Sequence, residues 1–347
     1  MKAAAGIVAR RGAARPLLAA RMLALVLAGA CAAAGAPQTA DAFGERWALL
    51  VAGVSGSPEL RQQYLGEIRE LRNVLVDSLG FSAERVIALF EDPALASVLV
   101  RYRSTREGLE LACREIAGRA ASSDLVFAFF LGHGSFDGRT YKLNLVGPDP
   151  TAEELAATLY AIPAACFVVV NATSASGGSV AALARDRAVV VAATRSGNER
   201  NQTRLAAYLI EALRDRNADL DKNGRISVLE AFTYAARKVE DYYAKEGLLQ
   251  TEHPVLDDDG DGVARTDPGP ANGEGMLART TYFDAATAGR TAQSAEERAL
   301  TREAEALEAE IEKLKYAKAG MPQEEYERKL ETLLLRLAEI HAKLRKK

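Results

Sequence analysis

Residues 125–138, with the sequence LVFAFFLGHGSFDG, indicate the fold class of this 347-residue chain. The first seven residues of the stretch are apolar throughout, as in a strand that is buried on both faces of a parallel sheet. A Gly132-His133-Gly134 turn follows directly. The sequence therefore predicts a buried strand that ends in an accessible histidine.

Further apolar runs alternate with amphipathic segments along the chain. One such segment, residues 58–79, has apolar side chains at helical spacing, and Ser104 and Thr151 each begin a capping box for a helix. This alternation predicts an α/β fold, a mostly parallel sheet with helices on both faces. In such sheets, ligands bind at the carboxyl ends of the strands. The expected strands are residues 47–54, 85–90, 125–131, 166–170 and 188–193.

The fourth expected strand is followed by a turn that is rich in hydroxyl groups and glycine, residues 171–178. Because the ends of parallel strands meet at one edge of a sheet, we expect Ser174 in this turn to lie close to His133. A base beside a hydroxyl group is the layout of nucleophilic catalysis, and the backbone N–H groups of Gly134 and Ser174 could form an oxyanion hole. Asp137 is the candidate third group that orients the imidazole. The alternative is structural: a turn histidine and a serine that caps a helix.

These two turns resemble the catalytic turns of the caspase-like cysteine peptidases, and more narrowly those of the legumain-like branch. His133-Gly134 matches the His-Gly that carries the family's catalytic histidine, and Ser174-Ala175-Ser176-Gly177 matches its Cys-x-Ser-Gly segment. Residues 193–197 match the family's next turn, and the resemblance covers about residues 45–250. It implies a peptidase fold whose substrate or ligand is a peptide or a protein.

The chain departs from the family at the nucleophile, since Ser174 stands in place of the cysteine. Cys113 lies on an apolar helix face and Cys166 begins a strand, so neither can substitute for it. A cysteine thiol, with a pKa of ~8.5, is partly ionised near neutral pH, whereas a serine hydroxyl depends on a general base. Two functions follow. We favour an inactive homologue that binds or scaffolds a partner over an active endopeptidase with a His133–Ser174 dyad.

A calcium-binding loop is the most specific motif of the chain. Residues 219–230 fit the twelve-residue EF-hand loop at every key position, and the amphipathic segments 203–214 and 227–245 flank it as helices. Gly224 stands at position six, where the loop turns sharply. The sequence thus predicts calcium as the bound cofactor. The expected ligands are Asp219, Asp221 and Asn223 at positions one, three and five, the main-chain carbonyl of Arg225 at seven, Ser227 at nine and Glu230 at twelve.

A second acidic loop, residues 257–262, follows the same pattern in part. Asp257, Asp259 and Asp261 stand at positions one, three and five, but a proline stands at position twelve. Without the bidentate glutamate, the loop is expected either to bind calcium weakly through other ligands or to be a solvated turn. Both loops fall within the expected globular domain, residues 43–290.

The N-terminal segment, residues 1–42, is typical of a secretory signal peptide. A basic stretch without acidic residues precedes the apolar run 22–36, which is too short for a stable transmembrane helix, and small residues allow cleavage after Ala42. The mature protein is therefore expected in the periplasm or outside the cell, with no integral membrane span. Lipidation at Cys31 is the less favoured alternative.

From Ser294 the composition changes to Glu, Lys, Arg, Ala and Leu, with apolar residues at heptad spacing. Gly320-Met321-Pro322 interrupts the pattern, which predicts an antiparallel helical hairpin, a short coiled coil, over residues 291–347. The hairpin is expected to pack on itself, to pack on the globular domain or to bind a protein partner. Before it, residues 276–283 are expected to return as an edge strand.

Charge and cysteine content exclude other classes of protein. A formal net charge of −3 gives no basic domain of the kind that binds nucleic acid, so no nucleic-acid partner is expected. Three cysteines and three histidines are too few for a disulfide scaffold or a Cys/His zinc cluster.

Overall fold

The computed structural model of the protein describes residues 43–284 and 295–345. The expected signal peptide, its cleavage site and Cys31 lie outside the described residues, as does the expected domain boundary at residue 290. Within the described part of the chain, no helix combines the length and apolar character needed to cross a membrane.

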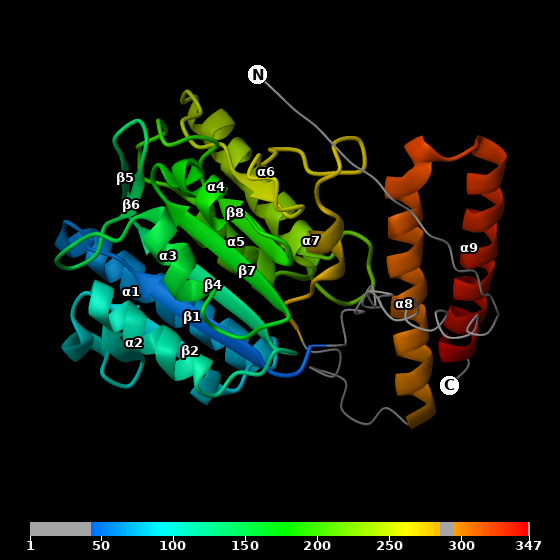
Figure 1. The fold of residues 1–347 in the computed structure, drawn as a ribbon, viewed down its shortest axis with the longest axis horizontal. Helices are drawn as coiled ribbons and strands as arrows, with labels where there is room; N and C mark the ends of the chain where they lie inside the picture. Colours follow the sequence, from blue (N-terminus) through cyan, green and yellow to red (C-terminus); the bar gives the residue numbers. More distant parts are fainter. Residues whose placement is uncertain (1–42, 285–294, 346–347) are drawn as a thin grey trace, which may run out of the picture. The chain divides into compact units, whose positions relative to one another are not determined.

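A seven-stranded sheet forms the centre of the globular part (Figure 1). Six of its strands are parallel, and only the edge strand β9 runs antiparallel to its neighbour, so the predicted mostly parallel sheet is confirmed. In spatial order the strands are β3 (Val100–Arg103), β2 (Val86–Phe90), β1 (Arg46–Ala52), β4 (Leu125–Gly132), β7 (Cys166–Thr173), β8 (Ala188–Ala192) and β9 (Val255–Asp257).

The sequence did not predict β3 or the small hairpin of β5 (Gly134–Phe136) and β6 (Tyr141–Leu143). β3 lies at the edge of the sheet, where alternate residues are exposed, so it lacks the apolar run that marks the buried strands. The hairpin strands are three residues long each, too short to show an apolar run.

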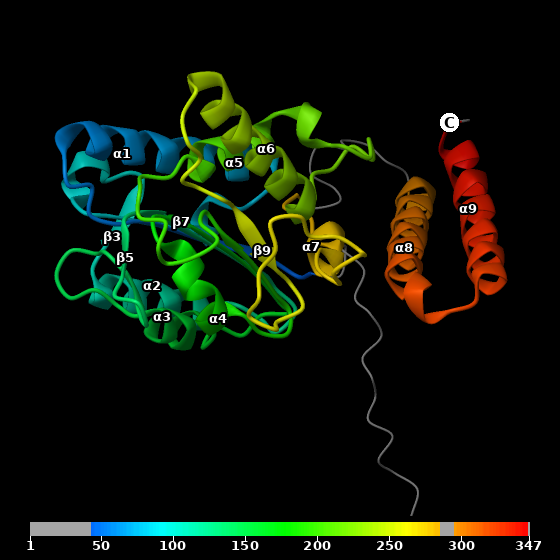
Figure 2. The same cartoon turned by 90° about the horizontal axis from the view of Figure 1, so that it is seen from above.

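Helices cover both faces of the sheet, as the sequence predicts (Figure 2). The side chains of β4 alternate between the two layers: Phe127 and Phe129 pack with the helices of one face, and Val126 and Phe130 with those of the other. The first face carries α1 (Pro58–Asn73), α5 (Leu205–Arg214) and α6 (Val228–Glu246), and the second carries α2 (Arg106–Ala117), α3 (Ala152–Leu159) and α4 (Val180–Leu183). α1 continues as a short π-helix, Val74–Ser78, which completes the predicted segment 58–79.

Of the two helix caps that the sequence predicts, the structure has one at the expected residue and the other one residue later. The capping box at Thr151 is confirmed, since its hydroxyl accepts the N–H of Glu154 while the Glu154 carboxylate accepts the N–H of Thr151. The box at Ser104 is wrong by one residue, because Thr105 caps α2 by accepting the N–H of Gly108. Ser104 is buried beside β2 and donates its N–H to the carbonyl of Phe90.

The expected edge strand at 276–283 is also wrong, because its first part is the short helix α7 (Met276–Thr280). Gly275 begins this helix with φ of 89°, a left-handed conformation that glycine adopts without strain. The carboxylate of Asp258 accepts the N–H groups of Gly275 and Ala278, at 2.6 and 2.8 Å. A cap supplied by a distant part of the chain thus decides the local structure.

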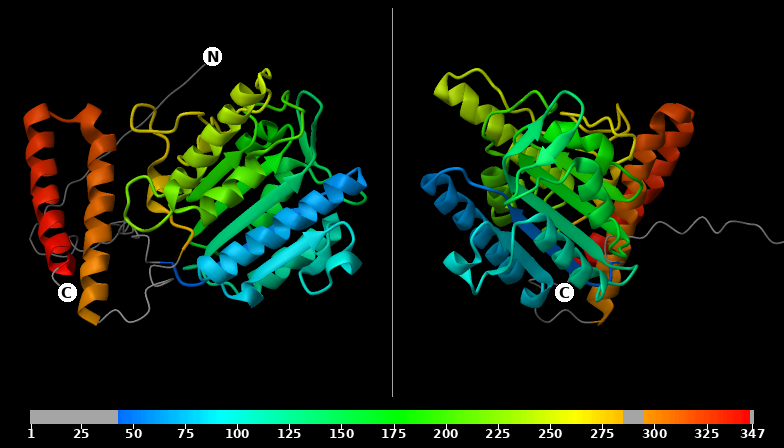
Figure 3. Two further views of the ribbon diagram at one scale, coloured as in Figure 1. Left: turned by 180° about the vertical axis from the view of Figure 1, so that it is seen from behind. Right: turned by 60° about the vertical axis from the view of Figure 1, so that its left-hand side comes forward.

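The C-terminal segment is the predicted helical hairpin (Figure 3). α8 (Ala295–Ala317) and α9 (Gln323–Arg345) are joined by a turn that contains Gly320. The predicted heptad positions form the apolar contact between the helices. They are the buried Ala304, Leu307 and Ile340 and the partly buried Leu300, Leu333, Leu337 and Leu344.

Candidate functional site

His133 and Ser174 stand at neighbouring strand ends. β4 pairs in parallel with β7, with Gly132 opposite Thr173, and each candidate residue directly follows its strand. His133 is half-buried, and Ser174 is only 3% exposed. The topology of the sheet therefore brings the base and the hydroxyl that the sequence singled out to the same edge.

The hydroxyl of Ser174 is paired with the main chain of Gly134. Its oxygen accepts the N–H of Gly134 at 3.1 Å and donates to the carbonyl oxygen of Gly134, also at 3.1 Å. Nε2 of His133 lies instead 3.4 Å from the hydroxyl of Tyr64 on α1, and the two rings meet edge to face. Among the described residues, no hydrogen bond joins the imidazole to Ser174.

Close packing behind Ser174 fixes this arrangement. A Cβ at Gly134 would lie 2.4 Å from Cε2 of Tyr141 and 2.5 Å from the carbonyl oxygen of Ser174, so only glycine fits. The Tyr141 hydroxyl lies 2.6 Å from that of Thr173, and burial raises the pKa of Tyr141 to about 12. Ala175, the residue after the serine, is left-handed with φ of 57° and donates its N–H to the carbonyl of Glu199 at 2.7 Å.

Asp137, the candidate orienting group, belongs to the turn between β5 and β6. Its carboxylate accepts the N–H groups of Thr140 and Arg139, at 2.8 and 2.9 Å, and these bonds lower its pKa. A residue that the sequence did not single out, Tyr64 in the predicted helical segment 58–79, contacts the imidazole. His253 is engaged elsewhere, with Nδ1 2.6 Å from a carboxylate oxygen of Glu199.

The loop 219–230 is held together by hydrogen bonds to its own acidic side chains. The carboxylate of Asp219 accepts the N–H groups of Asn223 and Gly224, at 3.1 and 2.9 Å, and Gly224 has the positive φ of 85° that the sharp turn requires. The carboxylate of Glu230 closes the loop by accepting the N–H groups of Leu220 and Ser227, each at 2.9 Å.

Three carboxylates of this loop converge. Asp219, Asp221 and Glu230 each present an oxygen within 4.8 Å of the others. Burial and the like charges of Glu230 and Asp219 raise the pKa of Asp221 to about 6. These residues fit a divalent cation with oxygen ligands, because such a cation would neutralise charges that now repel one another.

A segment distant in sequence pairs with this loop. Ser227 bridges to Tyr282, the N–H of Val228 donates to the carbonyl of Thr281 at 2.8 Å, and Asn223 donates to the Tyr282 hydroxyl at 3.2 Å. The guanidinium of Arg225 lies 4.1 Å from the centre of the Tyr282 ring. The loop 219–230 is thus held by contacts from a segment that lies outside the EF-hand pattern.

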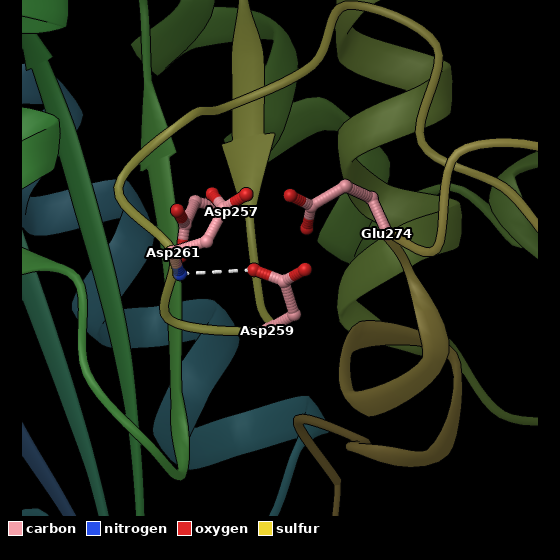
Figure 4. A group of neighbouring side chains, drawn as sticks. All are labelled: Asp257, Asp259, Asp261 and Glu274. Atoms are coloured by element: carbon pink, nitrogen blue, oxygen red, sulfur yellow. Dashed lines mark hydrogen bonds between the residues drawn. The ribbon is translucent and has the colours of Figure 1, made fainter.

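The second acidic loop gains a fourth carboxylate from outside its pattern (Figure 4). Asp257, Asp259, Asp261 and Glu274 present oxygens that all lie within 4.8 Å of one another. Burial is the main cause that raises the pKa of Glu274 to about 8, and burial also raises that of Asp257. Sequence reasoning missed Glu274 because it lies beyond the twelve residues of the pattern.

Comparisons with known proteins leave the family open. No protein-family model and no curated protein matches the chain. Among solved structures, the chain is similar to caspase-1 from Spodoptera frugiperda, with 14% sequence identity and a TM-score of 0.38, over 64% of this chain and 88% of that one. A likeness at this level is too low to assign a family.

Proposed function

We propose that this protein is an exported, calcium-binding homologue of the caspase-like peptidases whose peptidase centre is inactive, and that it acts by binding a peptide or a protein. The motifs at His133-Gly134 and Ser174–Gly177 support the kinship. One observation carries the loss of catalysis: both hydrogen bonds of the Ser174 hydroxyl go to the main chain of Gly134.

A serine nucleophile needs a general base that takes its proton in the transition state. The proton of Ser174 points to the carbonyl oxygen of Gly134, which is no base at neutral pH, while the nearest partner of the His133 ring is Tyr64. The pair therefore lacks the contact that activates a hydroxyl.

The candidate oxyanion hole is compromised by the same contact. The N–H of Gly134 would have to face the developing negative charge of a substrate, but it donates to the hydroxyl oxygen of Ser174. An attacking serine would have to break both bonds before it could reach a substrate. A cysteine in this position would be less dependent on the base, because a thiol ionises far more readily.

A cleavage assay with a peptide library in the presence of calcium tests this function. We expect no cleavage by the wild type and no adduct of a serine-directed phosphonate on Ser174. The Ser174→Cys variant tests whether a thiol at this position restores cleavage. Adding His133→Ala to that variant tests whether any restored activity depends on the histidine. Ser135→Ala, which removes an exposed hydroxyl on β5, is the matched control.

Cleavage by the wild type that is lost in both Ser174→Ala and His133→Ala, and kept in Ser135→Ala, would establish the active dyad and overturn the proposal. Export is tested separately. The mature protein isolated from the producing cell should be found outside the cytoplasm and begin at Phe43, and an intact N-terminus in the cytoplasm would contradict it.

A further inference from the structure

The second acidic loop folds around its first carboxylate. Asp257 is the last residue of β9 and is fully buried. Its carboxylate accepts the N–H groups of Gly260 and Gly262, at 3.2 and 2.7 Å, and Gly262 has the positive φ of 79° at position six of the pattern. Asp259 accepts the N–H of Asp261 at 2.9 Å (Figure 4). The backbone thus takes the course of a calcium loop through position six.

Glu274 supplies an observation, independent of the loop pattern, that points to a bound ion. Its side chain is 1% exposed, and its Oε2 accepts the N–H of Asp258 at 2.9 Å. Its Oε1 is buried and has no hydrogen-bond partner among residues 43–284 and 295–345. A buried polar atom without a partner is costly to keep and calls for an explanation such as an ion. The carboxylate faces those of Asp257 and Asp259 (Figure 4).

The fold holds Glu274 in this place through Asp258. The carboxylate of Asp258 caps α7, accepting the N–H groups of Gly275 and Ala278. Asp258 therefore ties the loop to the residue that follows Glu274. The position of Glu274 is set by main-chain contacts as well as by its own carboxylate.

We propose that Asp257, Asp259, Asp261 and Glu274 bind one calcium ion, with Glu274 in the role of the glutamate that the loop lacks at position twelve. All four ligands are carboxylates, which suit a hard cation such as calcium better than zinc, whose structural sites use Cys and His. Calcium accepts six to eight oxygens in a flexible shell, with bidentate carboxylates, whereas magnesium demands a stricter octahedron and keeps its waters. This second site is separate from the loop 219–230, and variants of Glu274 and of Glu230 test the two sites independently.

Isothermal titration calorimetry of the full chain tests the proposal. Calcium is titrated into protein from which a chelator has first removed metal, in the presence of excess magnesium. We expect two calcium ions per wild-type chain and one per chain of Glu274→Gln. Glu230→Gln should also bind one ion, and the double variant none. Glu252→Gln is the matched control, because Glu252 is equally buried but accepts only the N–H groups of Arg204 and Leu205. It should bind two.

A wild type that binds a single ion, which is retained in Glu274→Gln and lost in Glu230→Gln, would overturn the second site and leave the first intact. Two ions in Glu274→Gln would equally remove Glu274 from the site. Circular dichroism checks that each variant is folded. If Glu274→Gln does not fold, the exposed loop acid Asp261 provides the second variant. Asp261→Asn should weaken calcium binding at one site and leave the other unchanged. The proposal would be refuted if both sites of this variant kept the affinities of the wild type.

Discussion

The hydroxyl oxygen of Ser174 lies 3.1 Å from both the main-chain nitrogen and the main-chain oxygen of Gly134. This reciprocal contact joins the ends of two neighbouring strands, β4 and β7. It engages the serine hydroxyl both as an acceptor and as a donor, while the imidazole of His133 contacts Tyr64. The contact depends on glycine at position 134, because a side chain there would collide with Tyr141.

Gly134→Ala should therefore destabilise the protein. A Cβ 2.4 Å from Tyr141 and 2.5 Å from the Ser174 carbonyl forces the two strand ends apart, and overpacking of this kind costs about 1–3 kcal/mol. Urea denaturation measures the loss. Gly66→Ala is the control, since a Cβ at this position of helix α1 would meet no atom within 4 Å. It should gain about 0.5–1 kcal/mol, and equal effects of the two variants would contradict the steric argument.

Removal of calcium should lower the unfolding temperature. An ion that binds only the folded protein stabilises it by ~2.7 kcal/mol when the free ion is at about one hundred times its Kd. Thermal unfolding with calcium and with a chelator measures this difference. Glu230→Gln should lose the part of it due to the loop 219–230 while keeping the cap of α6, because glutamine can also accept the N–H of Ser227.

A variant outside both acidic loops serves as the matched control for this measurement. Glu252→Gln should respond to the chelator as the wild type does, because its carboxylate contacts no acidic cluster. A wild type whose unfolding temperature does not change on chelation would count against calcium binding at either loop.

Stability should fall with rising pH because of Glu252. Burial raises the pKa of this carboxyl to about 7 from its usual 4.5. The folded protein then binds more protons than the unfolded chain between these values, so this contribution to stability is lost as the pH rises from about 4.5 to 7. Glu252→Gln cannot ionise. Denaturation at pH 4.5, 6 and 8 should show the variant improving relative to the wild type as the pH rises, and a constant difference would refute the shift.

Leu307→Ala should loosen the C-terminal hairpin. Leu307 is 4% exposed between α8 and α9, and truncation of such a buried leucine costs about 2–5 kcal/mol. Leu335→Ala removes a leucine of α9 that is 61% exposed and serves as the control. In limited proteolysis, residues 295–345 should be cleaved faster in Leu307→Ala alone. Equal cleavage of both variants would show that the seam does not hold the hairpin.

The sequence predicts much of the fold because its signals are local. Apolar runs such as residues 125–131 form the buried strands, and the heptad positions Leu307 and Ile340 form the seam of the hairpin. The errors occur where a distant group intervenes. Residues 276–280 form a helix because the carboxylate of Asp258 caps it. Thr105 caps α2 because the N–H of Ser104 donates to the carbonyl of Phe90.

The sequence by itself determined the parallel α/β sheet, the terminal hairpin and the loop with Asp219 to Glu230, because each depends on residue spacing within one segment. Only the tertiary structure decided the partners of the site residues. It joined Ser174 to Gly134, His133 to Tyr64 and Glu274 to Asp257, pairs that lie 17 to 69 positions apart in the chain. Spacing along a chain encodes which face a side chain takes, but contacts across such separations arise only when strands and helices pack.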